Sequence, residues 1–276
     1  MGSPHRQQRI DAWLRRPADT NTTVPTPSTP PATGLRVVAL YDKHGTSALP
    51  WAARGFECEA HDPSIDGRIS KSATSLPNVR LCRSALKTAD DLRDAVGDTT
   101  NVAFVLVHPP CRDLCTAGAR WWKRKERQNP QFQMQTKRFL KMVYATLTDL
   151  DVPFAILVPS GKRIQRCFPR PPFLFNPCEF GGHLLARAPH PFFSTIPAQD
   201  AYTKRTLCVT SPGVRIPPRL PVTPIFFRFS QKDGSTRKVS PVLASRKRRE
   251  ARSCPPLGFC TALCVAAIRE RSPGKF

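Results

Sequence analysis

One cysteine of the chain stands where a catalytic nucleophile is expected. Cys111 directly follows Pro109 and Pro110, which come after an apolar run at residues 101–107. Because prolines fix φ and stiffen a turn, the thiol is expected to be held in one place. Three cations that would favour the thiolate follow it: Arg112, Arg120 and Lys123. A fixed thiolate at a strand end suits covalent catalysis, and an ordinary buried cysteine is the alternative interpretation.

The elements around Cys111 predict an alternation of strands and helices. Short apolar runs predict strands at residues 35–41, 56–60, 79–82, 101–107 and 153–159. Helices are expected at 47–54 and 132–150, and a closing apolar helix at 259–268. Weaker strands are expected at 207–210 and 225–229. This alternation predicts an α/β fold, Rossmann-like, with a mostly parallel sheet.

Three polar or proline-containing turns follow predicted strands. They are residues 42–46, which contain Gly45, residues 108–111, and residues 159–161. In an open parallel sheet, ligands bind in the crevice beyond the carboxyl ends of the strands. Strand, glycine-containing turn, helix, strand and a terminal acid at Asp62 is also the order of a nucleotide-binding βαβ unit. The three turns are therefore expected to meet at one ligand site.

Five segments resemble phage- and virus-type DNA cytosine-5 methyltransferases, in the family's order and spacing. The first two are the Pro-Pro-Cys at 109–111 with Gly118–Lys123, and Asn176–Gly182. The others are Thr203–Thr206, Arg252–Ser253, and Pro256 with Gly258 and Phe259. The resemblance covers about residues 35–270. It implies a Rossmann-like fold that depends on S-adenosylmethionine.

The resemblance also implies a reaction and a set of site residues. A target cytosine would leave the duplex, the Cys111 thiolate would add to its C6, and C5 would take the methyl group. The implied cofactor contacts are Tyr41, Gly45, Thr46, Asp62 and Pro109. The implied DNA contacts are Arg120, Trp121, Trp122, Lys123, Arg124, Lys125, Lys204 and Arg205. For the two tryptophans, packing in the core is an equal alternative to base contact.

One position departs from the family in a way that bears on activity. The family has a glutamate as partner of the cytosine N3, and Leu157 stands in its place. Leucine cannot assist at N3, and general acid assistance contributes about 10²–10⁴-fold. Glu179 is a conceivable substitute. Two alternatives to an active enzyme follow: a catalytically inactive relative, or pseudoenzyme, that binds DNA or a replication partner, and a methyltransferase redirected to another base or to RNA.

The charge of the chain indicates a polyanionic partner. Lysine and arginine number 43 against 20 acidic residues, a formal net charge of +23. Because phosphate contacts supply most non-specific nucleic-acid affinity, DNA is the expected partner. The cysteine spacings contain no CxxC pair, so reduced thiols in an intracellular protein are expected, in nucleus or cytoplasm. No membrane span and no metal are expected.

Composition divides the chain into four parts. Residues 1–34 are expected to be a disordered tail, since residues 20–33 are rich in threonine and proline. Within it, Gln7, Ile10, Trp13 and Leu14 resemble a peptide that docks on replication sliding clamps, and a frayed helix is the alternative. The remaining parts are a methyltransferase-like domain at 35–230, a basic linker at 231–252 that includes Arg246–Arg249, and a C-terminal helix at 253–270.

Overall fold

The centre of the molecule is a seven-stranded sheet. The computed structural model describes residues 34–65, 78–169, 172–230, 235–243 and 249–271. The strand order is β3-β2-β1-β4-β5-β7-β6. The strands are β1 Arg36–Leu40, β2 Glu57–His61, β3 Val79–Cys82, β4 Val102–Val107, β5 Phe154–Pro159, β6 Phe173–Phe175 and β7 Thr206–Thr210.

The sheet is mostly parallel, as predicted from the alternation of elements. β1 pairs in parallel with β2 and β4, β2 pairs in parallel with β3, and β4 pairs in parallel with β5. β7 runs antiparallel to both of its neighbours, β5 and β6. Strands β1 and β4 are neighbours, and the chain continues from them toward opposite halves of the sheet. The crevice beyond their carboxyl ends is the ligand position of such folds.

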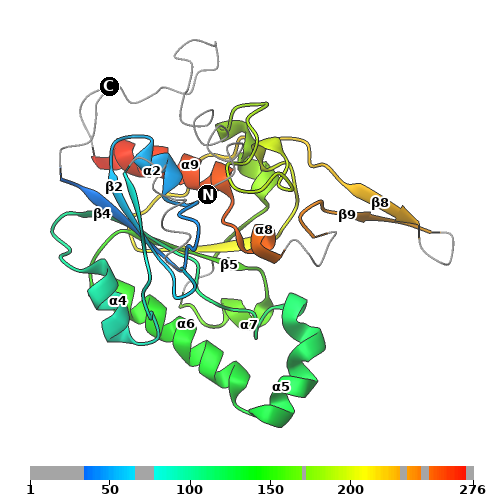
Figure 1. Ribbon diagram of the computed structural model, residues 1–276, viewed down its shortest axis with the longest axis horizontal. Coiled ribbons are helices and arrows are strands. Elements are labelled where there is room, and N and C mark those ends of the chain that lie inside the picture. The colour runs from blue at the N-terminus through cyan, green and yellow to red at the C-terminus, as the bar shows by residue number, and fades with distance from the viewer. Residues whose placement is uncertain (1–33, 66–77, 170–171, 231–234, 244–248, 272–276) are drawn as a thin grey trace.

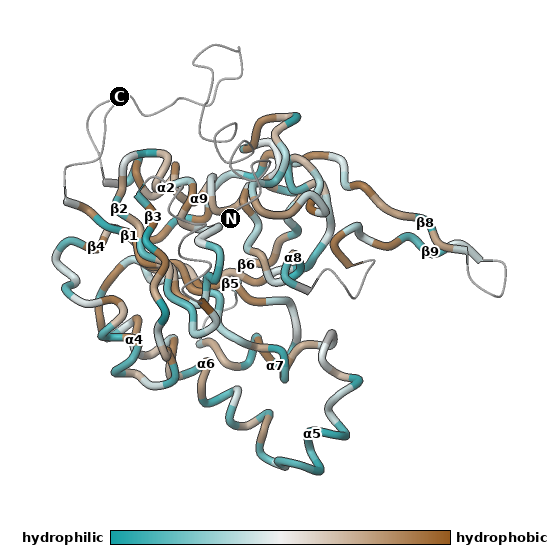
Figure 2. Tube along the Cα trace, viewed as in Figure 1, coloured by the Kyte–Doolittle hydropathy of each residue, from teal (hydrophilic) through white to brown (hydrophobic). Residues whose placement is uncertain are grey.

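Helices cover both faces of the sheet (Figure 1). On one face lie α2 Leu49–Ala52 and α9 Leu257–Arg271. On the other lie α4 Ala89–Val96, α6 Phe132–Asp149 and α7 Lys162–Gln165. The central strands β4 and β5 are strongly hydrophobic (Figure 2). Every residue of β4 is buried. The Rossmann-like α/β fold follows from this arrangement.

Two of the segments that resemble the methyltransferase family pack against each other. Residues Pro177–His183 form the 3₁₀ helix η2, which packs on the first turn of α9. The rings of Phe180 and Phe259 meet edge to face, with centroids 4.9 Å apart. A Cβ atom on Gly258 would lie 2.6 Å from the Phe180 carbonyl oxygen, so only glycine allows this approach. Both segments therefore hold α9 on the sheet.

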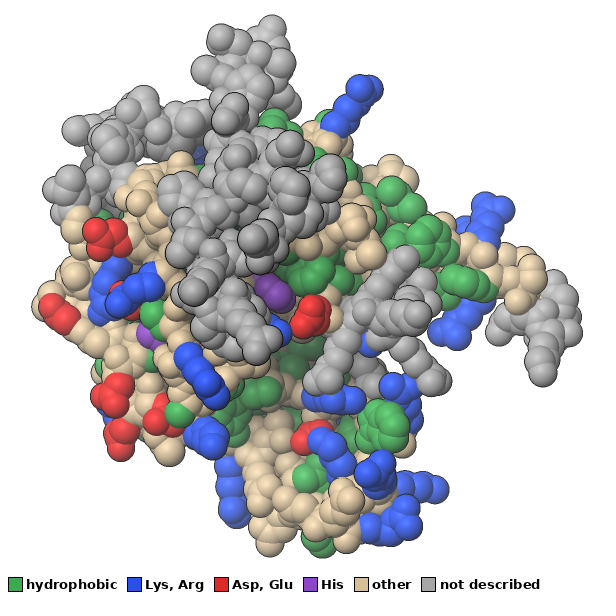
Figure 3. Space-filling view, in the orientation of Figure 1, with side chains coloured by type: hydrophobic (Ala, Val, Ile, Leu, Met, Phe, Trp, Pro, Cys, Tyr) green, Lys and Arg blue, Asp and Glu red, His purple; other side chains and the backbone are tan. Residues whose placement is uncertain are grey.

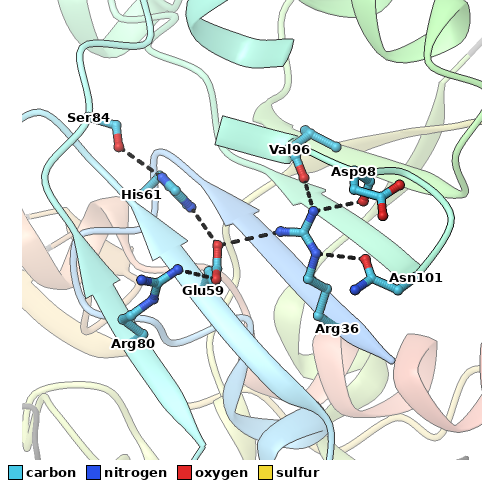
Figure 4. A network of polar contacts seen from close by, with 8 residues as sticks. All are labelled: Arg36, Glu59, His61, Arg80, Ser84, Val96, Asp98 and Asn101. Carbon is cyan, nitrogen blue, oxygen red and sulfur yellow. Dashed lines mark hydrogen bonds and ion pairs between the residues drawn. The ribbon is translucent and has the colours of Figure 1, made fainter. Parts of the chain in front are cut away.

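A network of polar contacts ties β1, β2 and β3 together (Figure 4). Glu59 of β2 is paired with Arg36 of β1, at 3.5 Å, and with Arg80 of β3. His61 approaches Glu59 through Nε2, at 3.4 Å, and Ser84 through Nδ1, at 2.8 Å. Arg36 also donates to the side-chain oxygen of Asn101, at 2.9 Å. The network fixes the strands whose carboxyl ends form one half of the crevice.

Several boundaries differ from the sequence prediction. The predicted linker at 231–252 contains β9 Thr236–Val239, which pairs with β8 Phe227–Ser230 in a second, two-stranded sheet, and α8 Arg249–Ser253. The polar residues of β9 give no apolar pattern from which this pairing could be predicted. The predicted C-terminal helix begins at Leu257, after Pro255 and Pro256. The predicted tail, apart from Gly34, and Arg246–Arg248 lie outside the described residues.

One stretch, Glu250–Glu270, has the length and hydropathy of a membrane span, with 72% of its apolar window buried inside the fold. The apolar residues of α9 belong to the core on the face of the sheet that α2 and α9 cover. Packing on the sheet therefore accounts for the composition of this stretch.

Candidate active site

A cavity of about 440 Å³ opens beyond the carboxyl ends of β1 to β4. Its wall is formed by Tyr41 after β1, Pro63 after β2, the segment 85–87 after β3, Pro110, Arg112 and Asp113 after β4, and side chains of α6. The apolar part of the wall includes Leu86 and Phe139. Its volume is within the range of about 300–1,000 Å³ that is typical of small-molecule sites.

Tyr41 is held in an unusual conformation at the mouth of this cavity. Its φ is +60°, a left-handed conformation that costs a residue with a side chain about 1–3 kcal/mol. Its backbone N–H donates to the His61 carbonyl at 2.7 Å, and its hydroxyl donates to the Leu86 carbonyl at 2.7 Å. The ring meets Phe139 edge to face, at 5.9 Å between centroids. Burial, with the charges of Asp91 and Asp62, raises the Tyr41 pKa, so the hydroxyl stays protonated.

The other predicted cofactor residues do not line this cavity. Gly45 has φ +65°, and a Cβ there would lie 3.1 Å from the Val79 side chain. Glycine therefore allows the left-handed turn to pack closely against β3. Thr46 is fully buried and accepts a hydrogen bond from Cys254, at 3.4 Å. Asp62 accepts the Ser64 N–H at 2.7 Å. Pro109 is buried, and its neighbour Pro110 forms the wall.

Cys111 lies directly behind the cavity wall. Its two chain neighbours, Pro110 and Arg112, line the cavity, while Cys111 itself is 6% exposed and packs in the core under α6. The Cys115 thiol donates to the Cys111 carbonyl at 3.1 Å. A hydrogen bond with the Cys115 side chain and burial raise the pKa of Cys111. This differs from the expectation that neighbouring cations favour the thiolate, because the Arg112 side chain is exposed while the thiol is buried.

Lys204 is the cation that acts on the thiol. Its ammonium donates to the Arg252 carbonyl at 2.6 Å, and burial lowers its pKa. Its charge opposes the rise in the Cys111 pKa without outweighing the hydrogen bond and burial. Lys204 was predicted to contact DNA, but its ammonium is directed into the protein because it satisfies this carbonyl. The His108 Nε2 is buried with no hydrogen-bond partner among the described residues, and burial lowers the His108 pKa to about 4.

No carboxylate replaces the family's glutamate at the expected position. Leu157 is 5% exposed and lies in the core of the α9 face. Glu179, the conceivable substitute, accepts the Asn176 N–H at 2.9 Å and pairs with Arg219 at 3.0 Å. It therefore serves as the cap of η2. Cys115 and Lys204, the groups that chiefly act on Cys111, are not carboxyl groups.

The predicted DNA contacts lie mainly on one protrusion. Thr116–Trp121 forms the 3₁₀ helix η1, which leads into α5 Trp122–Gln128. Arg120, Lys123 and Arg124 are exposed there, as is Arg205 elsewhere. Blue side chains gather over α5 in the space-filling view (Figure 3). Lys125 is half-buried and pairs with Asp113. The structure thus groups four of the six predicted cations on η1 and α5, and one of them, Lys125, lines the cavity.

The two predicted tryptophans have different surroundings. Trp121 is 37% exposed, and the guanidinium of Arg120 lies 5.0 Å from its ring centroid. Trp122 is half-buried beneath the guanidinium of Arg163, at 4.3 Å. The Trp122 Nε1 is buried with no hydrogen-bond partner among the described residues. Trp121 is therefore available to a ligand, and Trp122 serves as a packing residue.

Sequence reasoning missed two features near the site. Leu86, which forms part of the cavity wall, follows β3 in a segment without any recognisable motif. Asp200 is 1% exposed, and its carboxylate accepts the Gly258 N–H at 2.8 Å, capping α9. Burial raises the Asp200 pKa to about 7. The sequence around Asp200 does not reveal this capping role, because the helix that Asp200 caps begins 57 residues later, at Leu257.

Comparisons with known proteins gave only distant structural similarities. No family model and no curated protein matches the chain. A TehB-like SAM-dependent methyltransferase from Corynebacterium glutamicum is similar with a TM-score of 0.32 and 13% identity, over 75% of this chain and 86% of that one. The glycopeptide N-methyltransferase MtfA in complex with S-adenosyl-L-methionine gives a TM-score of 0.27 and 11% identity, over 82% and 77% of the chains. Structural similarity at these TM-scores supports no assignment of function to this chain. The fold class rests on the strand order of the sheet.

Proposed function

We propose that the cavity beyond β1 to β4 binds S-adenosylmethionine. Its place at the switch point between β1 and β4 supports this, since ligands of open α/β sheets bind there. The rings of Tyr41 and Phe139, with Leu86, would hold the adenine, which is flat and aromatic. Lys87 and Arg112 would balance the carboxylate of the methionine part. When bound, the cofactor supplies the methyl group.

The proposed reaction is methylation of cytosine C5 in DNA, with Cys111 as the nucleophile. The observation that carries it is that Cys111 stands between two residues of the cavity wall, at the end of a buried strand. Cys111 would bond to C6 of a cytosine that has left the duplex, after its thiol proton has passed to solvent. Once C5 carries the methyl group, C5 would lose its proton to solvent and the bond between the sulfur and C6 would break, which frees Cys111. The exposed cations of α5 and η1 would hold the DNA phosphates.

A methyl-transfer assay tests this reaction. Purified protein, radiolabelled S-adenosylmethionine and unmethylated duplex DNA are incubated, and incorporation into DNA is counted. We expect incorporation by the wild type, none by Cys111→Ser, and retention by Cys115→Ser, which removes the neighbouring thiol. Incorporation by Cys111→Ser equal to that of the wild type would contradict the role of Cys111, and RNA as the better acceptor would contradict the choice of DNA.

A catalytically inactive DNA-binding protein is the second candidate. Two observations favour it: Leu157 lies in the core where the family has a carboxylate, and Cys111 is a buried thiol with a raised pKa. This candidate predicts cofactor or DNA binding without methyl incorporation in the same assay. A replication sliding clamp, bound through Gln7, Ile10, Trp13 and Leu14, remains a proposed partner on either account.

A further inference from the structure

The β8–β9 hairpin projects from the body of the molecule and carries aromatic and basic side chains (Figures 1 and 3). Much of the exposed hydrophobic surface gathers at its base and along β8, where the exposed fractions are 50% for Ile225, 40% for Phe226, 41% for Phe227 and 46% for Phe229. Gathered exposed apolar side chains mark an interaction site more often than scattered ones do. The hairpin is therefore a candidate binding surface.

The register of the hairpin separates its side chains onto two faces. Phe227 is opposite Val239 and Phe229 is opposite Arg237, so these four residues share one face, the aromatic face. Arg228 is opposite Lys238 on the other face, the basic face. Like charges directly opposite each other destabilise a pair of strands. The described stretches 225–230 and 235–243 contain no acidic residue, so a bound polyanion would relieve the repulsion between Arg228 and Lys238.

We propose that this hairpin binds single-stranded nucleic acid, with unpaired bases stacked on Phe227 and Phe229. The two residues are two apart on one strand, which places them about 6.7 Å apart. That spacing is roughly twice the 3.4 Å rise per nucleotide of a duplex strand, so stacked bases cannot offer one face to each ring. An extended strand with unstacked bases can do so. Arg237, which lies on the aromatic face, contacts a phosphate of the bound strand, and the charge of the basic face adds to the attraction.

A duplex fits the aromatic face poorly for a second reason. The grooves of a duplex expose base edges, which are read by hydrogen-bond donors and acceptors. The rings of Phe227 and Phe229 offer neither. Pairing of two copies through their aromatic faces is opposed by Arg237, which lies on that face in each copy, so two like charges would be brought together. This inference does not rest on the proposed methyl transfer, and a protein without cofactor or activity would still show it.

Fluorescence anisotropy tests the proposal with the full chain. The probes are a fluorescein-labelled, unstructured 20-nucleotide DNA strand and the duplex of the same sequence. We expect the single strand to bind more tightly than the duplex. Because stacking contributes about 1–3 kcal/mol per base, Phe227→Ala/Phe229→Ala should weaken single-strand binding at least about tenfold and change duplex binding less than about twofold.

Phe226→Ala is the matched control, since it removes an equally exposed ring that precedes the paired strand. It should change single-strand binding less than about twofold. Phe227→Leu/Phe229→Leu keeps apolar side chains without rings and should weaken binding as the alanine pair does, with an unchanged melting temperature. Tighter binding of the duplex, an equal loss in the Phe226 variant, or a dimer in sedimentation that the double variant abolishes would overturn the proposal.

Discussion

At the scale of single residues, the sequence identifies the Pro-Pro-Cys motif of Cys111 but does not predict the protonation state of its thiol. The turn after the buried strand places Pro110 and Arg112, the chain neighbours of Cys111, in the cavity wall. The thiol faces the core, where Cys115 and burial raise its pKa. Which way a side chain points after a turn depends on long-range packing, here against α6. The cations that follow Cys111 in sequence could not reveal this.

Asp200 gives a prediction at the same scale. Its pKa is about 7 in the folded protein and about 3.9 in an unfolded chain, so the folded state binds the extra proton between these values. The free energy of unfolding should therefore fall as the pH rises from about 4 to about 7. Asp200→Asn should remove this contribution and be the more stable protein at pH 7.5, by roughly 1–4 kcal/mol.

Urea unfolding of both proteins at several pH values measures this difference. At pH 4.5 the difference should be much smaller than at pH 7.5, because the Asp200 carboxyl of the folded protein is then neutral. Asp149→Asn, which changes an exposed carboxyl at the end of α6, is the control and should show no such trend. Parallel stability curves for the wild type and Asp200→Asn across this range would contradict the account.

At the scale of elements, the hydrophobic strands and α6 could be predicted closely, and the elements with polar surfaces could not. β4, β5 and the start of α6 agree with the prediction to within one residue, because apolar residues specify buried elements. α4 was missed although Thr88 begins it with a capping box. α5 has no buried residue, so its sequence carries no periodic signal. β8 overlaps the strand expected at 225–229, whereas β9 is almost wholly exposed and polar and leaves no core pattern.

The strand network gives a prediction at the element scale. Glu59 is paired with Arg36, Arg80 and His61. Burial opposes its ionisation, but the hydrogen bonds and charges of Arg80 and His61 outweigh burial and lower the Glu59 pKa. Glu59→Gln should lower the free energy of unfolding by about 1–3 kcal/mol at pH 7, because charge-assisted hydrogen bonds are lost.

Glu57→Gln, an exposed change on the same strand, is the control and should lower the free energy of unfolding by less than about 0.5 kcal/mol. Equal effects of the two substitutions in chemical unfolding would rule out a structural role for the network.

At the scale of the whole molecule, the positive charge of the chain includes two exposed groups of cations, one on α5 and one on the β8–β9 hairpin. The net charge of +23 predicts a polyanionic partner. The exposed cations of α5 lie beside the cavity, and the β8–β9 hairpin projects elsewhere from the body (Figure 1). A bound nucleic acid would thus find two basic surfaces on one chain. Composition alone predicts a polyanionic partner, whereas the positions of the exposed cations are seen only in the folded chain.

The central claim is that the cavity beyond β1 to β4 holds S-adenosylmethionine, and calorimetric titration tests it most directly. Thr136 lines the cavity from α6, and Thr136→Arg would fill it, whereas Ala145→Arg adds the same side chain to an exposed position of α6. We expect the wild type and Ala145→Arg to bind the cofactor or its demethylated product with micromolar affinity, and Thr136→Arg to bind neither. Absence of binding by the wild type, or unchanged binding by Thr136→Arg, would contradict the claim.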